Sequence, residues 1–275
     1  MSAATDHYGI DWEDAFNNVD HIPGGDGFPA IWTQRAAAFR ASCPGLEPDI
    51  AYGEAPRERL DLFRPAGTPK GLVVFVHGGY WMVTDKSIWS DLAAGPLAQG
   101  WAVALPSYTL APEARIGHIT RQIGAAITRA AGLVDGPIRL TGHSAGGHLV
   151  TRMACDDSPL PAEITQRLAA VVSISGLHDL RPLRHHSMNG TLALDEAEAR
   201  AESPVLHTPL PGIPITCWTG ALERPEFLRQ SQLLAEAWSG RSDMRPAVYE
   251  PGCHHYNVVD GLKSADHPLT QALLG

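Results

Sequence analysis

The sequence predicts an α/β fold with a mostly parallel central sheet and helices on both faces. Short β-rich runs recur along the 275 residues, and patterns typical of amphipathic helices separate them. The chain is 44% hydrophobic, which suffices for the core of one domain of this size. We therefore expect a single domain over residues 1–275.

Each expected strand is a short run rich in β-branched or large apolar residues. The run 72–76 is continuously apolar, as expected for a strand covered on both faces, whereas 59–64 alternates. In chain order, the expected strands are 59–64, 72–76, 101–105, 138–141, 169–174, 213–218 and 246–249.

Helical spacing fills the intervals between these runs. Ile116, Ile119 and Ile123 recur at intervals of three and four residues and predict an amphipathic helix. Residues 28–42 form another expected helix, with a proline suited to its first turn, and a third begins near Pro225. Because helices alternate with strands, we expect parallel βαβ units, whose chemistry gathers at the carboxyl ends of the strands.

Charge and composition narrow the choice of partners. The formal net charge is -9 and basic runs are absent from the sequence, so neither nucleic acid nor an anionic membrane is an expected partner. The first residues carry no basic cluster followed by an apolar run, so we expect no signal peptide and a cytoplasmic location.

The cysteines and histidines do not show metal-site spacing. Cys43, Cys155, Cys217 and Cys253 are far apart and predict reduced thiols. The chain has 13 histidines but no HExxH motif, so we expect no metal and no cofactor.

A GxSxG motif follows the expected strand 138–141. It runs from Gly142 through Ser144 to Gly146, and a helix-compatible segment comes directly after it. Strand, sharp turn and helix are the context in which the serine of this motif serves as a nucleophile, exposed on a strained turn. We predict that Ser144 is the nucleophile of a serine hydrolase, with the N–H of Ala145 as one donor to an oxyanion.

A second glycine motif follows the expected strand 72–76. The segment His77-Gly78-Gly79-Tyr80-Trp81 places two glycines where backbone N–H groups must approach a developing oxyanion closely. We therefore predict that Gly78 and Gly79 complete the oxyanion hole.

These motifs resemble those of α/β-hydrolase serine hydrolases, and more narrowly those of kynurenine formamidases (arylformamidases) and related bacterial esterases. The resemblance extends over roughly residues 77–262. It is carried by HGGYW (77–81), GHSAGGHL (142–149), SGLHDLRPL (175–183), Ser203-Pro204, PEF (225–227), RQS (229–231) and His255-Tyr256.

The resemblance implies the α/β-hydrolase fold and the remaining members of a catalytic triad. It assigns the acid to Glu223, where the family usually has aspartate, and the base to His255. Position after a strand leaves Asp179 open as the acid, and the adjacent His254 stays open as the base. Residues 1–45 are expected to form an extension that packs near the mouth of the active site.

The implied reaction is cleavage of a small acyl amide or ester through an acyl-enzyme. N-formylkynurenine or a related formanilide is the substrate that the resemblance favours, and a small-substrate carboxylesterase is the alternative. Tyr80, Trp81 and Tyr256 flank the motifs and are expected to form an apolar wall for the substrate. A non-catalytic binding module with this fold is a third hypothesis, which activity on an activated aryl ester would exclude. The expected partner is a small molecule, and a homodimer is left open.

Overall fold

The computed structural model describes residues 9–275, so residues 1–8 of the expected N-terminal extension lie outside it. An eight-stranded sheet has the order β1-β2-β4-β3-β5-β6-β7-β8. β2 is antiparallel to both its neighbours, and the strands from β4 to β8 are parallel. The strands are β1 (Leu46–Ala51), β2 (Arg59–Phe63), β3 (Leu72–Val76), β4 (Ala102–Pro106), β5 (Ile138–His143), β6 (Leu168–Ile174), β7 (Ile215–Gly220) and β8 (Val248–Glu250).

The predicted fold class is confirmed, and every expected strand is present within two residues of its predicted start. β1 was not predicted. Its residues lie at the sheet edge and are exposed or half-buried throughout, so they lack the apolar run that marks a covered strand. Pro48 and Asp49 within it also weaken the local strand signal.

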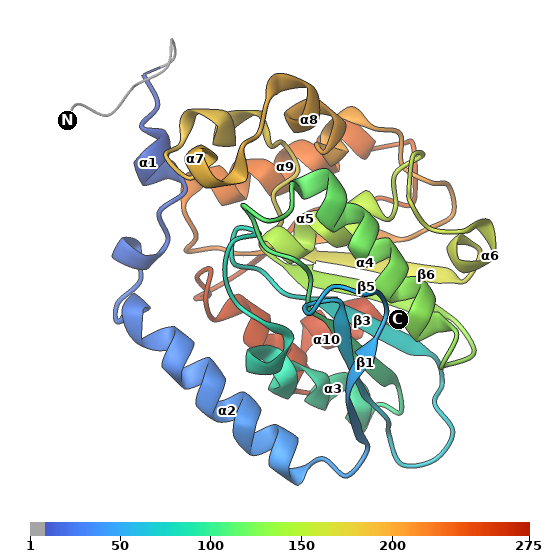
Figure 1. The fold of residues 1–275 in the computed structure, drawn as a ribbon. Coiled ribbons are helices and arrows are strands. Elements are labelled where there is room, and N and C mark those ends of the chain that lie inside the picture. The colour runs from blue at the N-terminus through green and yellow to red at the C-terminus, as the bar shows by residue number, and fades with distance from the viewer. Residues whose placement is uncertain (1–8) are drawn as a thin grey trace.

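Two layers of helices cover the sheet (Figure 1). On one face, α4, α5 and α9 pack on strand residues such as Leu72 and Val74, and on the other, α2, η3 and α10 pack on Val73 and Phe75. The alternation follows from the two-residue period of a strand. The α-helices are α1 (Trp12–Ala15), α2 (Phe28–Ser42), α3 (Ala94–Ala98), α4 (Ile116–Ala131), α5 (Ala145–Arg152), α6 (Ala162–Thr165), α7 (Asn189–Leu192), α8 (Glu196–Ala201), α9 (Pro225–Trp238) and α10 (Pro268–Leu274).

Between these elements lie six 3-10 helices of the described residues: η1 (Val19–His21), η2 (Gly25–Gly27), η3 (Lys86–Ala93), η4 (Arg181–His185), η5 (Pro204–Leu206) and η6 (Val258–Lys263). The predicted helix 28–42 is confirmed as α2, and Pro29 lies in its first turn. Within the described residues, no helix has both the length and the apolar character needed to cross a membrane.

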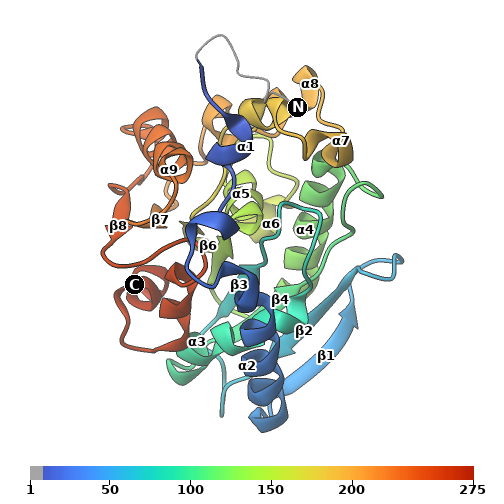
Figure 2. The same ribbon diagram turned by 90° about the vertical axis from the view of Figure 1, so that its left-hand side faces the viewer.

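Parallel pairing of β3, β5, β6 and β7 brings the carboxyl ends of these strands to one edge of the sheet. Ser144 follows β5, Ser175 follows β6, and Glu223 comes shortly after β7. In Figure 2, the N-terminal segment (blue) passes in front of the sheet on its way from α1 to α2. Three segments that are far apart in the sequence can therefore contribute to one site.

Candidate active site

Ser144 occupies the turn between β5 and α5. Its backbone has φ 56 and ψ -117, a conformation that a non-glycine residue rarely adopts, and its N–H donates to the Ile174 carbonyl at 2.8 Å. The turn is tight because α5 begins at once. A Cβ on Gly146 would lie 1.9 Å from the Val76 carbonyl oxygen, so only glycine fits there. The predicted strand–turn–helix context of the GxSxG motif is present.

Glu223 and His255 form a buried pair. Glu223 Oε2 lies 2.6 Å from His255 Nδ1, and neither side chain is more than 4% exposed. In the tautomer that this contact favours, Nδ1 carries the proton and donates to the carboxylate. The other ring nitrogen, Nε2, is then left as the basic atom.

The second carboxylate oxygen of Glu223 is held by two donors. Oε1 accepts from the Gly220 backbone N–H at 2.8 Å and from Ser175 Oγ at 2.5 Å. These contacts fix the direction of the carboxylate toward His255. Ser175 begins the SGLHDLRPL segment, but no role was predicted for it, although it follows β6 directly, at the sheet edge where functional residues gather.

His143 holds the backbone of His255. Burial lowers the pKa of the His143 ring well below the ordinary histidine value, and the neighbouring His255 adds to this effect. The ring is therefore neutral near pH 7, and its Nε2 donates to the His255 carbonyl oxygen at 2.8 Å. The face of the His255 ring also packs on Phe227, with centroids 4.4 Å apart. The position of His255 is thus set by its backbone and by its ring.

Ser144 and His255 line one cavity of about 170 Å³. Within the described part of the chain, no hydrogen bond joins Ser144 Oγ to the His255 ring. Catalytic hydrogen bonds are often long in the absence of substrate. Half of the other residues of the cavity wall come from the N-terminal segment and the HGGYW loop. The full set is Asn18, Pro29, Trp32, Gly79, Tyr80, Val83, Thr84, Trp89, His143 and Tyr256.

The glycines of the HGGYW loop adopt the close approach that the motif predicts. Gly79 has φ +102, and a Cβ there would lie 2.4 Å from the Val83 carbonyl oxygen. A Cβ on Gly78 would lie 3.0 Å from that of Ser144, so this backbone passes directly beside the serine. Ala145 is the first residue of α5, where backbone N–H groups lack partners within the helix. The oxyanion-binding role of these groups stays a prediction.

The three aromatic residues expected to form the substrate wall lie in different surroundings. Tyr80 and Tyr256 line the cavity. Trp81 does not: its side chain is fully buried in the main hydrophobic core and packs edge-on against His148. The expectation for Trp81 therefore needs correction, because positive φ at Tyr80 and Trp81 turns the loop and directs the indole inward. Trp32 and Trp89 line the cavity instead, although no local motif indicated them.

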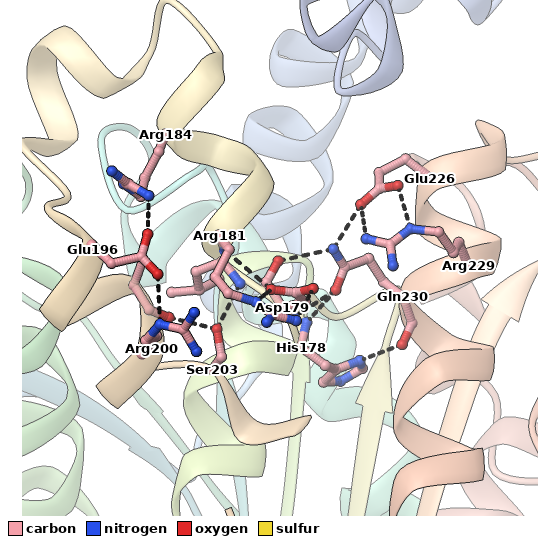
Figure 3. Close-up of polar contacts among 12 residues, drawn as sticks. His178, Asp179, Arg181, Arg184, Glu196, Arg200, Ser203, Glu226, Arg229 and Gln230 are labelled. Atoms are coloured by element: carbon pink, nitrogen blue, oxygen red, sulfur yellow. Dashed lines mark hydrogen bonds and ion pairs between the residues drawn. The ribbon is translucent and has the colours of Figure 1, made fainter. Parts of the chain in front are cut away.

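Asp179 and His254, the alternatives for the acid and the base, are engaged elsewhere. The Asp179 carboxylate accepts from Arg181 Nε at 2.8 Å and Nη2 at 2.9 Å, and Gln230 holds its backbone (Figure 3). The His254 ring accepts from the Tyr256 N–H and packs against Phe28. Both residues brace loops.

One cluster in the described residues could offer three ligand atoms to a metal ion. Asp156, Asp157 and His207 place these atoms within 4.8 Å of one another. Arg152 already pairs with both oxygens of Asp157, at 2.7 and 2.8 Å. None of the three residues lines the cavity around Ser144.

Comparison with known proteins identifies the family of this chain. The sequence pattern described as BD-FAE matches residues 60–209, which is more than half of the chain. The chain belongs to the BD-FAE family. The matched range contains the HGGYW loop and the GxSxG motif and ends before Glu223 and His255.

Two relatives align with most of the chain. A kynurenine formamidase from Salmo salar is 27% identical over 237 residues, which span 82% of this chain and 80% of that protein. A crystal structure from Silicibacter sp. TM1040, for which thioesterase activity has been proposed, is 46% identical with a TM-score of 0.93. It covers 97% of this chain and 100% of that one.

A more distant structure shows the same fold. Esterase B from Lactobacillus rhamnosis superposes with a TM-score of 0.67 at 21% identity, over 90% of both chains. The resemblance to α/β-hydrolases is thus confirmed, and so is the predicted enzyme class of this BD-FAE family member, a serine hydrolase. The assignment of individual catalytic roles stays a prediction.

Proposed function

We propose that this BD-FAE family member is an arylformamidase that removes a formyl group from an aromatic amine. The observation that carries the proposal is the cavity itself, which contains Ser144 and His255 and is small and aromatic. Its volume of about 170 Å³ lies below the ~300–1,000 Å³ of pockets that hold drug-sized ligands. A compact substrate with a short acyl group suits this space.

Aromatic side chains make up much of the cavity wall. Trp32 and Trp89 lie against each other with centroids 4.6 Å apart, and Tyr256 meets Trp32 edge-on at 5.2 Å. Tyr80 contributes a further ring. Stacked and edge-to-face contacts with an aryl group are favourable beyond the area they bury. The aromatic part of a formanilide therefore has a suitable environment beside Ser144.

The proposed reaction runs through a formyl-enzyme. His255 Nε2 takes the proton of Ser144 as Oγ attacks the formyl carbon, and Glu223 stabilises the imidazolium that forms. Backbone N–H groups of Gly79 and Ala145, with Gly78 beside them, receive the oxyanion, each donor contributing about 3 kcal/mol. The imidazolium then protonates the amine nitrogen as the C–N bond breaks. His255 then takes a proton from water, which attacks the formyl ester. The imidazolium returns this proton to Ser144 Oγ as the ester bond breaks, and formic acid leaves and ionises to formate.

A small-substrate carboxylesterase is the second candidate. It is favoured by the Silicibacter relative, whose proposed activity is cleavage of a thioester. The same triad would cleave an ester, since only the leaving group changes. The two candidates therefore differ in substrate preference rather than in machinery.

Matched substrates separate the two candidates. Formanilide, phenyl formate and phenyl acetate share a phenyl group and differ in leaving atom and acyl group. We expect turnover of formanilide, with phenyl formate preferred over phenyl acetate by at least about tenfold in kcat/KM, because the cavity is small. Turnover of both esters without detectable cleavage of formanilide would instead identify a carboxylesterase.

The proposal also covers the role of the N-terminal residues, the cellular compartment and the oligomeric state. Residues 1–45 act as an extension of one hydrolase domain and supply part of the substrate wall, a role supported by Asn18, Pro29 and Trp32 at the cavity. The cysteines are unpaired among the described residues, which supports a reducing compartment such as the cytoplasm. The substrate is a small molecule. A homodimer stays a prediction, which analytical ultracentrifugation tests.

A further inference from the structure

Asn18 brings a polar group from the N-terminal segment into the cavity of Ser144. It precedes η1 and is only 5% exposed, yet it lines that cavity. Asparagine is seldom buried without hydrogen bonds, because an unmet amide group costs about 1–3 kcal/mol. The nitrogen and the oxygen of its side-chain amide differ in their hydrogen bonding.

The Tyr80 hydroxyl fixes the orientation of the Asn18 amide. Tyr80 Oη donates its single proton to the Phe16 carbonyl oxygen at 2.5 Å. It can therefore only accept from Asn18, whose Nδ2 lies 3.3 Å away. Burial raises the pKa of Tyr80, so the phenol keeps this proton at neutral pH. The amide nitrogen of Asn18 is thus committed to Tyr80.

The carbonyl oxygen of Asn18 is the free end. Across residues 9–275, Asn18 Oδ1 has no hydrogen-bond partner in the protein, and Asn18 lines both this cavity and a neighbouring pocket with Glu13, Phe16 and His186. This atom is an acceptor only, so it is complementary to a donor on the bound molecule. Asn18 and Ser144 both line this cavity of about 170 Å³, so a molecule that fills it lies close to both residues.

We propose that Asn18 is a specificity-determining residue whose Oδ1 accepts a hydrogen bond from an N–H of the aromatic amine portion of the substrate. This deepens the proposed arylformamidase function and rests on it. An aryl ester has an oxygen in place of that N–H group. With an ester bound, Asn18 Oδ1 stays unpaired and faces another acceptor, which selects against the ester.

The first experiment compares para-nitroformanilide with para-nitrophenyl formate, which differ in N–H against O. In Asn18→Leu we expect kcat/KM for the anilide to fall about tenfold or more, since a lost hydrogen bond of ~1.4 kcal/mol is tenfold. The ester value should fall by a smaller factor, so that the amide-to-ester ratio of kcat/KM decreases. Asn17→Ala is the matched control: this neighbouring residue bonds Asp20 and does not line the cavity, so the amide-to-ester ratio should not change.

An unchanged amide-to-ester ratio in Asn18→Leu would overturn the role of Asn18. If both activities fall equally, Asn18 only supports the fold of the N-terminal segment. If neither falls, Oδ1 makes no contact with the substrate. Thermal unfolding of both variants separates a loss of structure from a loss of recognition.

A second experiment keeps the inference testable if the wild type does not cleave the anilide. Ortho-aminoacetophenone and acetophenone are compared as competitive inhibitors of ester hydrolysis, since only the former carries N–H donors. We expect tighter inhibition by the amine in the wild type and equal inhibition by both in Asn18→Leu. Equal inhibition in the wild type would refute the role of Asn18. Failure to cleave the anilide would refute the arylformamidase proposal alone.

Discussion

Replacing Glu223 by glutamine is expected to fix the wrong tautomer of His255. The site of Oε1 is occupied by two donors, the Gly220 N–H and the Ser175 hydroxyl. The carbonyl oxygen of glutamine will take this position, because the backbone N–H of Gly220 cannot become an acceptor. The NH₂ group is then directed at His255 Nδ1 and donates to it. The ring proton moves to Nε2, where it prevents His255 from accepting the proton of Ser144.

The size of the effect follows from this geometry. The pair is buried, with 2.6 Å between Glu223 Oε2 and His255 Nδ1, so water cannot replace the lost acceptor. In comparable triads, the wrong tautomer lowers kcat by ~10⁴-fold with the fold intact. Glu223→Asp keeps the charge and tests whether the length of the side chain matters. One methylene shorter, aspartate cannot satisfy Gly220 and His255 together, and loss of one charged hydrogen bond of about 1.5–3 kcal/mol predicts a ~10–150-fold decrease.

The assay is kcat for an activated aryl formate, measured with Tm for each variant. Ser175→Ala removes one of the two donors and keeps Gly220, so a loss of only about tenfold is expected. Asp179→Asn is the control, because that carboxylate bonds to Arg181 and should affect Tm more than kcat. An inactive but folded Asp179→Asn beside a nearly normal Glu223→Gln would refute the assignment of the acid.

The other predictions test the nucleophile, the base and the oxyanion loop. Ser144→Ala should abolish turnover with Tm unchanged, and a fluorophosphonate should label the wild type at Ser144; labelling of another serine contradicts this. His255→Ala should lower kcat by about 10⁴-fold or more, and His254→Ala by less than about tenfold, with the reverse order excluding His255 as the base. Gly79→Ala should lower kcat by ~10²-fold, since its Cβ would lie 2.4 Å from the Val83 carbonyl oxygen; normal kcat would show that this loop is not needed.

The sequence predicted the parts of the fold that depend on local pattern. The continuous apolar run of β3 and the isoleucine spacing of α4 each show, within a few neighbouring residues, which side chains are buried. Both elements are present. The turn at Ser144 was predictable for a different reason. Its glycines are needed for backbone contacts that side chains would prevent, so the motif itself records the geometry.

Residues fixed by contacts between distant segments were not predictable in this way. Ser175 reaches Glu223 only because β6 and β7 are neighbours in the sheet. Asn18 meets Tyr80 across 62 positions of sequence. The direction of the Trp81 side chain was not predictable for a different reason: it depends on a positive φ that the letters HGGYW do not specify. Side-chain direction in loops depends on the finished fold.

The proposed triad and the substrate wall are held in place in different ways, which has a functional consequence. The proposed triad comes from the ends of β5 and β7 and from the segment after β8, where strand pairing fixes each position. Part of the substrate wall comes from the N-terminal segment and η3, which rest on the sheet through apolar packing and side-chain ion pairs to Asp61 of β2. Substitutions at Asn18 or Trp32 can therefore change the substrate without disturbing Glu223 and His255. On this argument the wall can diverge while the fold and the Glu223–His255 pair stay unchanged.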